Sequence, residues 1–212
     1  MLSTLASLVY DAYLQALRRH GTSRSHSKSV LRKARRLLLK LGDPDIVVPL
    51  DGFSFMTPFS SNILLFHFEF PFYDSVLPRL AKAVSAARGR LVMIDVGANV
   101  GVATYLVSRE TPGSFLCVEA NPRFKTSLTH NLTQIRQSRA EFSALTDEPR
   151  QISVSHNYAA GNSNIVRVEK GGEPLEFITL DELLRGKPDY CAPGLVKIDT
   201  EGYELRILRG AS

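Results

Sequence analysis

The chain has 212 residues, of which 44% are hydrophobic and 22% charged, and its formal net charge is +5. This length suits one sizeable core with a small appendage, and the composition is that of an ordinary globular protein, which excludes disordered and fibrous classes. No apolar stretch is long enough for a membrane-spanning helix, and the N-terminus lacks the basic start and cleavage site of a signal peptide. The expected location is therefore the cytoplasm.

The first part of the chain predicts two helices and carries most of the positive charge. Apolar residues at helical spacing predict one helix over residues 2–20 and another over residues 29–41. The second helix is expected to bury one apolar face, made of Val30, Leu31, Ala34, Leu37, Leu38 and Leu41. Nine Lys and Arg, and no Asp or Glu, occur from Arg18 to Lys40. A solvated helix face is the simplest role for this run, and peripheral contact with an anionic membrane surface is the alternative. Nucleic acid is not expected, because no aromatic platform accompanies the charge.

The next part is expected to be rich in β-structure. From Ile46 to Phe72, short apolar and alternating runs separated by Asp51-Gly52 and by prolines predict two or three strands or hairpin arms. His67 alternates with phenylalanines, so it is expected on the less buried face of a strand. A helical period from Leu77 to Ala87 then leads to the central strand.

Residues 91–101, LVMIDVGANVG, are the most informative stretch. The run from Leu91 to Ile94 is typical of a strand buried on both faces, and it ends at Asp95. Gly97 and Gly101 then let the backbone turn and approach a ligand before a helix begins. Strand, glycine loop and helix together are the ligand-binding corner of a doubly wound α/β domain.

The loop narrows the choice of cofactor. A dinucleotide fingerprint that starts at Gly97 would need glycine where this chain has Asn99 and Val102, and the Gly-Lys-Ser/Thr of a Walker loop is absent. What remains is a loop for a nucleoside with a compact charged tail. Asp95 can form an ion pair with an ammonium, and backbone N–H groups at the helix start can donate hydrogen bonds to a carboxylate. S-Adenosylmethionine carries both groups.

Several later segments extend this domain. Residues 114–118 predict a second buried strand that ends at Glu119, where a carboxylate is placed to accept hydrogen bonds from both hydroxyls of a ribose. A third strand is expected near residues 140–145. Residues 151–178 predict a strand-rich insertion that could shape the acceptor pocket, and Thr179 begins a capping box for the next helix.

The candidate catalytic residues follow a fourth predicted buried strand, residues 195–198. If the following loop is extended, Asp199 and Glu201 point the same way, toward the pocket over the strand ends. Methyl transfer from a sulfonium is an in-line displacement, so a residue has to orient the acceptor hydroxyl and receive its proton. Either carboxylate suits this task, with a structural or metal-binding role as the alternative. Two carboxylates can hold Mg²⁺, but a metal site needs more ligands than the sequence brings together. The simplest role for Lys197 is an ion pair with a neighbouring acid.

Four motifs in this order resemble the FkbM-type family of class I S-adenosylmethionine-dependent methyltransferases: IDVGANVG at 94–101, VEANP at 118–122, TLDEL at 179–183 and VKIDTEGYE at 196–204. The resemblance implies a Rossmann-like fold with a doubly wound, mostly parallel sheet. It also implies O-methylation of a hydroxyl on a sugar, glycan or polyketide-like small-molecule acceptor. The cofactor site that it implies includes further residues, namely Ala98, Asn99, Ala120, Asn121 and Ala144, the last beside the adenine.

The expected organisation is a basic, helical and β-rich segment over residues 1–89 and a methyltransferase domain over residues 90–212. Class I domains carry further strands after the fourth, so this domain is expected to be truncated after its fourth core strand. Truncation leaves one alternative open, an inactive module that binds S-adenosylmethionine and associates with membranes through its basic helices. A dehydrogenase is the weakest alternative, because the dinucleotide pattern is broken.

Overall fold

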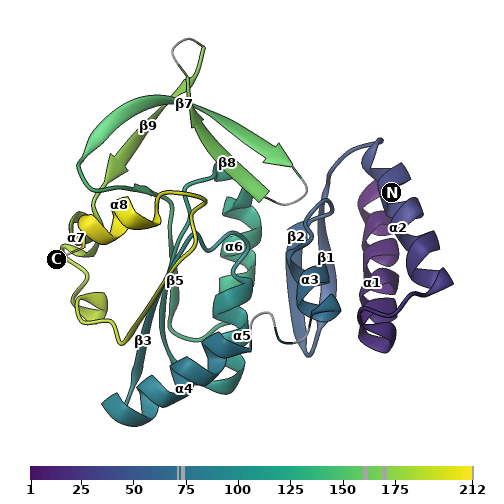
Figure 1. Cartoon of the computed structure of the whole chain (residues 1–212), viewed down its shortest axis with the longest axis horizontal. Helices are drawn as coiled ribbons and strands as arrows, with labels where there is room; N and C mark the ends of the chain where they lie inside the picture. Colours follow the sequence, from purple (N-terminus) through teal and green to yellow (C-terminus); the bar gives the residue numbers. More distant parts are fainter. Residues whose placement is uncertain (71, 73–74, 160–161, 169–170, 212) are drawn as a thin grey trace. The chain divides into compact units, whose positions relative to one another are not determined.

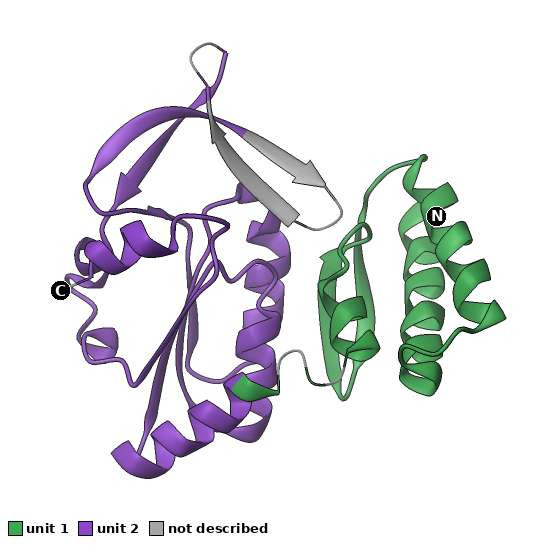
Figure 2. Cartoon of the chain, viewed as in Figure 1, with its two compact units in different colours: residues 1–76, 159–162 green, residues 77–158, 163–212 purple. Residues whose placement is uncertain are grey.

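The computed structural model describes residues 1–70, 72, 75–159, 162–168 and 171–211, with the backbone alone for residues 156–159 and 162–167. The chain forms two compact units (Figures 1 and 2). Unit 1 comprises residues 1–76 and 159–162, and unit 2 comprises residues 77–158 and 163–212. Among the described residues, no helix combines the length and the apolar character needed to cross a membrane.

Unit 1 joins a helical hairpin to a β-hairpin. Its elements in chain order are α1 (Leu2–His20), α2 (His26–Leu39), β1 (Asp45–Leu50), β2 (Phe53–Pro58) and α3 (Ile63–Glu69). The two predicted helices and the hairpin around Asp51-Gly52 are confirmed, since β1 and β2 pair antiparallel. Asp51 and Gly52 both have positive φ, 48° and 88°, as a type I′ turn requires.

Residues 63–69 were expected in a strand, and this expectation is wrong. They form α3, so His67 lies on a helix. The alternation of Phe66, His67 and Phe68 suggests a strand only locally. The adjacent Leu64 and Leu65 are the residues of this segment that are buried, and two consecutive buried residues do not fit a strand with one solvated face.

The face that α2 buries also differs from the prediction. Its buried positions are Lys28 and Arg35, whereas Leu37 is exposed. Arg35 explains the difference, because its Nε donates to Phe59 O at 3.0 Å and its Nη1 donates to Asn62 Oδ1 at 2.9 Å. These charge-assisted hydrogen bonds fix the helix by a polar side chain and turn part of the apolar face outward.

Unit 2 begins with helix α4 (Val76–Arg88), most of which belongs to it. The elements that follow are β3 (Leu91–Val96), α5 (Val102–Glu110), β4 (Gly113–Val118), η1 (Pro122–Phe124), α6 (Lys125–Leu132), β5 (Ser138–Glu141), β6 (Ala144–Leu145), β7 (Arg150–Ala159), β8 (Asn162–Arg167), β9 (Glu173–Ile178), α7 (Leu180–Leu184), η2 (Pro188–Tyr190), β10 (Leu195–Ile198) and α8 (Glu204–Arg209). The predicted capping box is confirmed, because Thr179 and Glu182 each bond the other's backbone at the start of α7.

The main sheet of unit 2 confirms the predicted parallel α/β architecture. Four parallel strands lie in the order β10-β3-β4-β5, so the first strand of the domain is central. All six residues of β3 are buried. In Figure 1, α5 and α6 lie on one side of this sheet and α7 and α8 on the other. Leu180, Leu183 and Ile207 of α7 and α8 pack with strand residues in one core cluster.

The predicted third strand is divided between two sheets, which corrects the prediction for residues 140–145. β5 pairs with β4, but Ala144 and Leu145 form β6 and pair with Phe177 and Ile178 of β9. This second sheet has the strand order β6-β9-β7-β8. The chain therefore leaves the main sheet after Glu141 and enters the second sheet at Ala144.

Candidate functional site

The glycine loop lies at the carboxyl end of β3, where ligands bind in open α/β sheets. Gly97 N and Ala98 N both donate to Val118 O, at 2.9 and 3.0 Å, so the loop is fixed to the end of β4. Gly97 has φ 73°, and a Cβ there would collide with the backbone carbonyl of Asp199. Glycine is needed because two loops of the candidate site approach each other at this point.

Glu119 connects the glycine loop to the next strand. Its buried carboxylate accepts hydrogen bonds from Asn99 N at 2.7 Å and from Asn121 N at 2.8 Å. Asn99 has φ 53°, a left-handed conformation that asparagine tolerates better than most residues. Burial raises the pKa of Glu119 above its ordinary value, although these backbone donors and Lys197 oppose the shift. The structure therefore brings Asn99, Glu119 and Asn121 together at the strand ends.

Asp95 is held beneath the loop and is fully buried. Lys197 Nζ lies 3.0 Å from Asp95 Oδ1, and Thr104 Oγ1 donates to Oδ2 at 2.9 Å. The ion pair predicted for Lys197 is thus confirmed. Because the carboxylate is already paired, a ligand ammonium would have to compete with Lys197. A cofactor contact of Asp95 stays a prediction.

Lys197 bridges the two loops of the site. Its Nζ donates to Gly97 O at 3.0 Å and lies 3.9 Å from Asp199 Oδ2. Burial alone would lower the pKa of Lys197, but the charge of Asp95, the hydrogen bond to it and the charges of Asp199 and Glu119 raise it above its ordinary value. Lys197 is therefore an ammonium at neutral pH and cannot accept a proton there.

The loop after β10 is a turn, which corrects the expectation of an extended loop. Glu201 has φ 52°, and the carboxylate of Glu204 accepts hydrogen bonds from Thr200 N and Gly202 N, both at 2.9 Å. Asp199 remains exposed, with 75% of its side-chain surface accessible. Burial and the charges of Asp199 and Glu204 raise the pKa of Glu201 above its ordinary value. Among the described residues, no group of three or more His, Cys, Asp or Glu could hold a metal ion.

An aromatic pair lies between the last motif and the second sheet. Tyr203 stacks on Phe177 of β9, with ring centroids 5.6 Å apart and planes 25° apart. Ala144 and Phe177 share a core cluster, and Ala120 packs against it. The structure therefore places both alanines predicted for the cofactor site around one aromatic pair.

The comparison with protein families decides the identity. The model of the Methyltransferase FkbM domain matches residues 95–212, more than half of the chain. The chain belongs to the FkbM methyltransferase family. No curated protein and no solved structure gives a significant match. The FkbM match covers the glycine loop, Glu119 and the turn after β10, and the four-stranded parallel sheet fits a Rossmann-like methyltransferase fold.

Sequence reasoning missed residues that support this FkbM site from beneath. Thr104 bonds Asp95, Asn131 Nδ2 donates to Val100 O at 2.8 Å, and Glu204 closes the turn after β10. The available signal for Thr104 is a polar residue whose neighbours in the helix are mostly apolar, whereas the segment around Asn131 is itself polar and gives no such signal. That pattern predicts a buried hydrogen bond but does not identify the partner.

Proposed function

We propose that this FkbM family member is an S-adenosylmethionine-dependent O-methyltransferase whose acceptor is a hydroxyl of a sugar, glycan or polyketide-like molecule. The observation that carries the proposal is the direct contact between Glu119 and the glycine loop at Asn99 N. An acid after the second strand and a glycine loop after the first are the two parts that a nucleoside site requires. In this proposal residues 90–212 form the cofactor-binding domain.

Glu119 is the residue proposed to recognise the ribose. A carboxylate has about four acceptor positions, so the backbone donors at Asn99 and Asn121 leave capacity for hydroxyl groups. The backbone N–H groups at the start of α5 are proposed to meet the carboxylate of the cofactor. Ala120 and Ala144, beside the Phe177 and Tyr203 rings, are proposed to border the adenine.

Asp199 and Glu201 are the residues proposed to act on the acceptor. When bound, the cofactor supplies a methyl group activated by its sulfonium. One of the two carboxylates would orient the acceptor hydroxyl and take the proton that its oxygen loses on methylation, with S-adenosylhomocysteine as the other product. Glu201 has the raised pKa of a better base, and Asp199 is the more exposed carboxylate next to Lys197. Lys197 stays protonated and supports the loops.

Isothermal titration of the full chain with S-adenosylmethionine tests the proposal. We expect Glu119→Gln to weaken binding about tenfold to a hundredfold, because a charge-assisted hydrogen bond contributes about 1.5–3 kcal/mol. Glu110→Gln, at an exposed acid of α5, is the matched control and should leave the affinity unchanged.

The outcomes separate the proposal from its alternatives. A folded chain that binds NAD in place of S-adenosylmethionine, or binds neither, refutes it. Binding without methyl transfer to any acceptor in a panel of hydroxylated sugars and polyketides favours a module that only binds the cofactor. Binding with transfer from radiolabelled S-adenosylmethionine to an acceptor oxygen supports the full proposal.

A further inference from the structure

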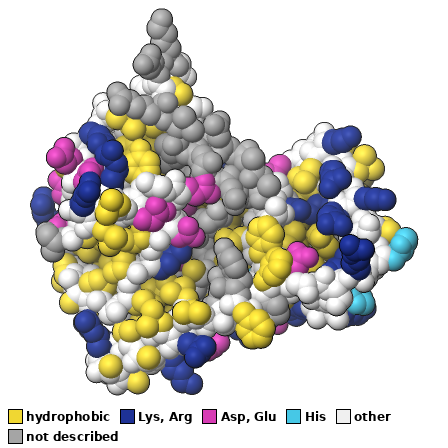
Figure 3. Space-filling view, in the orientation of Figure 1, with side chains coloured by type: hydrophobic (Ala, Val, Ile, Leu, Met, Phe, Trp, Pro, Cys, Tyr) yellow, Lys and Arg dark blue, Asp and Glu magenta, His cyan; other side chains and the backbone are white. Residues whose placement is uncertain are grey.

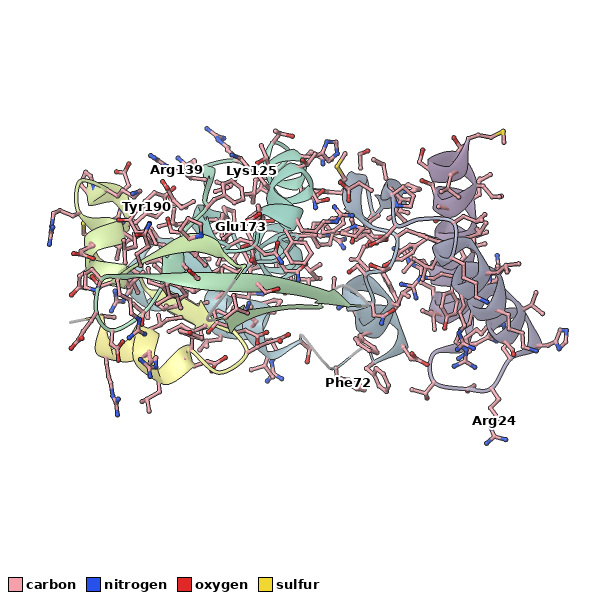
Figure 4. All side chains as sticks on the ribbon, turned by 90° about the horizontal axis from the view of Figure 1, so that it is seen from above. Arg24, Phe72, Lys125, Arg139, Glu173 and Tyr190 are labelled. Carbon is pink, nitrogen blue, oxygen red and sulfur yellow. The ribbon has the colours of Figure 1, made fainter. Side chains whose placement is uncertain are left out.

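The helical hairpin of unit 1 combines exposed leucines with a concentration of positive charge. Leu8 of α1, Leu37 of α2 and Leu41 just beyond α2 are 64%, 65% and 70% exposed. Seven Lys and Arg residues of the same hairpin are also exposed, namely Arg18, Arg19, Arg24, Arg32, Lys33, Arg36 and Lys40. Figure 3 shows Lys and Arg gathered over this part of the chain with hydrophobic side chains between them, and in Figure 4 Arg24 points away from the ribbon.

Two buried cations explain why α2 presents apolar side chains outward. Arg35 donates to Phe59 O and Asn62 Oδ1, and Lys28 Nζ donates to Gly21 O at 2.6 Å. These bonds fix the face of α2 that carries Lys28 and Arg35 against the rest of unit 1. Leu37 lies on a different face of the helix and is exposed.

On α2, two of the cations lie next to an exposed leucine. Lys33 precedes Leu37 by one helical turn and Lys40 follows it by about one turn, so both flank it on the same face. A Cβ on Gly42 would lie 3.4 Å from Leu2 Cδ2, so the chain after α2 returns beside the start of α1. Leu5 and Leu8 of α1 are therefore at the same end of the hairpin as Leu37 and Leu41.

We propose that this hairpin surface, made of Leu5, Leu8, Lys33, Leu37, Lys40 and Leu41, docks on an anionic phospholipid membrane. Cations attract the headgroups, and exposed leucines enter the boundary between headgroups and acyl chains, as in interfacial amphipathic helices. The charge argues against a second copy of this chain as the occupant, because two such surfaces repel each other. Nucleic acid fits less well, because the tyrosines of α1, Tyr10 and Tyr13, are buried and offer no platform for bases.

Co-sedimentation of the full chain with vesicles tests the proposal. One set of vesicles contains phosphatidylcholine alone, and in the other set part of it is replaced by phosphatidylserine. We expect binding to the anionic vesicles that falls as salt rises. Lys33→Gln and Lys40→Gln should each weaken partitioning about fivefold, and Leu37→Gln about tenfold, since each loses one interaction with the membrane.

Matched variants on α4 of unit 2 keep the test specific. Lys82→Gln removes an exposed cation and Leu80→Gln an exposed leucine, and neither should change partitioning. Circular dichroism of every variant shows whether the fold is intact. Equal binding to neutral vesicles, no binding to anionic vesicles, or losses as large in the α4 variants would overturn the proposal. Tighter binding to a DNA duplex than to the vesicles at the same salt would also overturn it.

Discussion

The buried ion pair between Asp95 and Lys197 gives the sharpest prediction. In Lys197→Met, Asp95 keeps its hydrogen bond from Thr104 but loses the ammonium that lies 3.0 Å away. Leaving one member of a buried pair uncompensated costs about 3–5 kcal/mol. We expect about 3 kcal/mol here, since 20% of the Lys197 side chain is exposed and water can reach the vacated position. Asp95→Asn/Lys197→Met should recover most of this loss, because neither charge then remains.

Urea unfolding followed by circular dichroism measures these free energies, and hydrogen exchange assigns them to a region. The protection of residues 91–96 and 195–198 should fall in Lys197→Met and return in the double variant, because β3 and β10 are the strands that the pair joins. Lys82→Met, at an exposed lysine of α4, is the control and should stay within about 0.5 kcal/mol of the unaltered chain. Equal stability of Lys197→Met and Lys82→Met would refute the reasoning, as would a double variant no more stable than Lys197→Met.

The pH dependence of the stability difference between the unaltered chain and Lys197→Met provides a further check. The pKa of Lys197 is raised above its ordinary value of 10.5. Its contribution to stability is therefore fully present below pH 10.5 and is lost as the pH rises through the raised pKa. The stability difference between the unaltered chain and Lys197→Met should be constant near neutral pH and shrink in strong alkali. A difference that disappears near neutral pH would contradict an ion pair.

Three further predictions concern the loops. Gly97→Ala should destabilise unit 2 and abolish the binding of S-adenosylmethionine, because the new Cβ collides with Asp199 O and the left-handed backbone adds about 1–2 kcal/mol of strain. Gly186→Ala is the control, because Gly186 has φ 82° and open space around it, so that only the backbone strain should appear. Because the pKa of Glu119 is raised in the folded chain, the contribution of Glu119 to the free energy of unfolding is fully present below pH 4.5 and is lost as the pH rises through the raised pKa. The melting temperature of Glu119→Gln should therefore rise relative to that of the unaltered chain as the pH increases over this range. If Glu201 is the base, kcat/KM should rise with pH through an inflection above 4.5; Glu201→Gln should abolish this limb, and Asp199→Asn should move it to lower pH.

Local signals were enough to predict the elements that are strongly periodic or bounded by particular residues. The apolar run from Leu91 to Ile94 and the glycines after it predicted β3 and its loop, and Thr179 with Glu182 predicted the start of α7. Local signals failed where tertiary partners decide. The Phe66–Phe68 alternation suggested a strand in what is a helix, and nothing local showed that Ala144 joins a second sheet.

The candidate site divides in the same way. Motif order predicted that Glu119 follows the second strand and that acids follow the fourth, but the sequence did not show that Glu119 contacts Asn99 N. The sequence also did not show that α2 exposes part of its apolar face, because this depends on hydrogen bonds from Arg35 to carbonyl and amide acceptors more than twenty residues away. Such long-range hydrogen bonds have no periodic signature in the sequence.

The two halves of the candidate site are joined through one small region. Gly97 has no Cβ and admits the Asp199 carbonyl, while Lys197 Nζ donates to Gly97 O and lies near the Asp199 carboxylate. The glycine loop is proposed to hold the cofactor and Asp199 to act on the acceptor, so a change at Lys197 should affect both. Lys197→Met should weaken S-adenosylmethionine binding and also lower kcat at saturating cofactor. Asp95→Asn/Lys197→Met should restore stability without restoring kcat, because the link from Gly97 O to Asp199 is still absent. Full recovery of kcat in the double variant would show that Lys197 acts through stability alone.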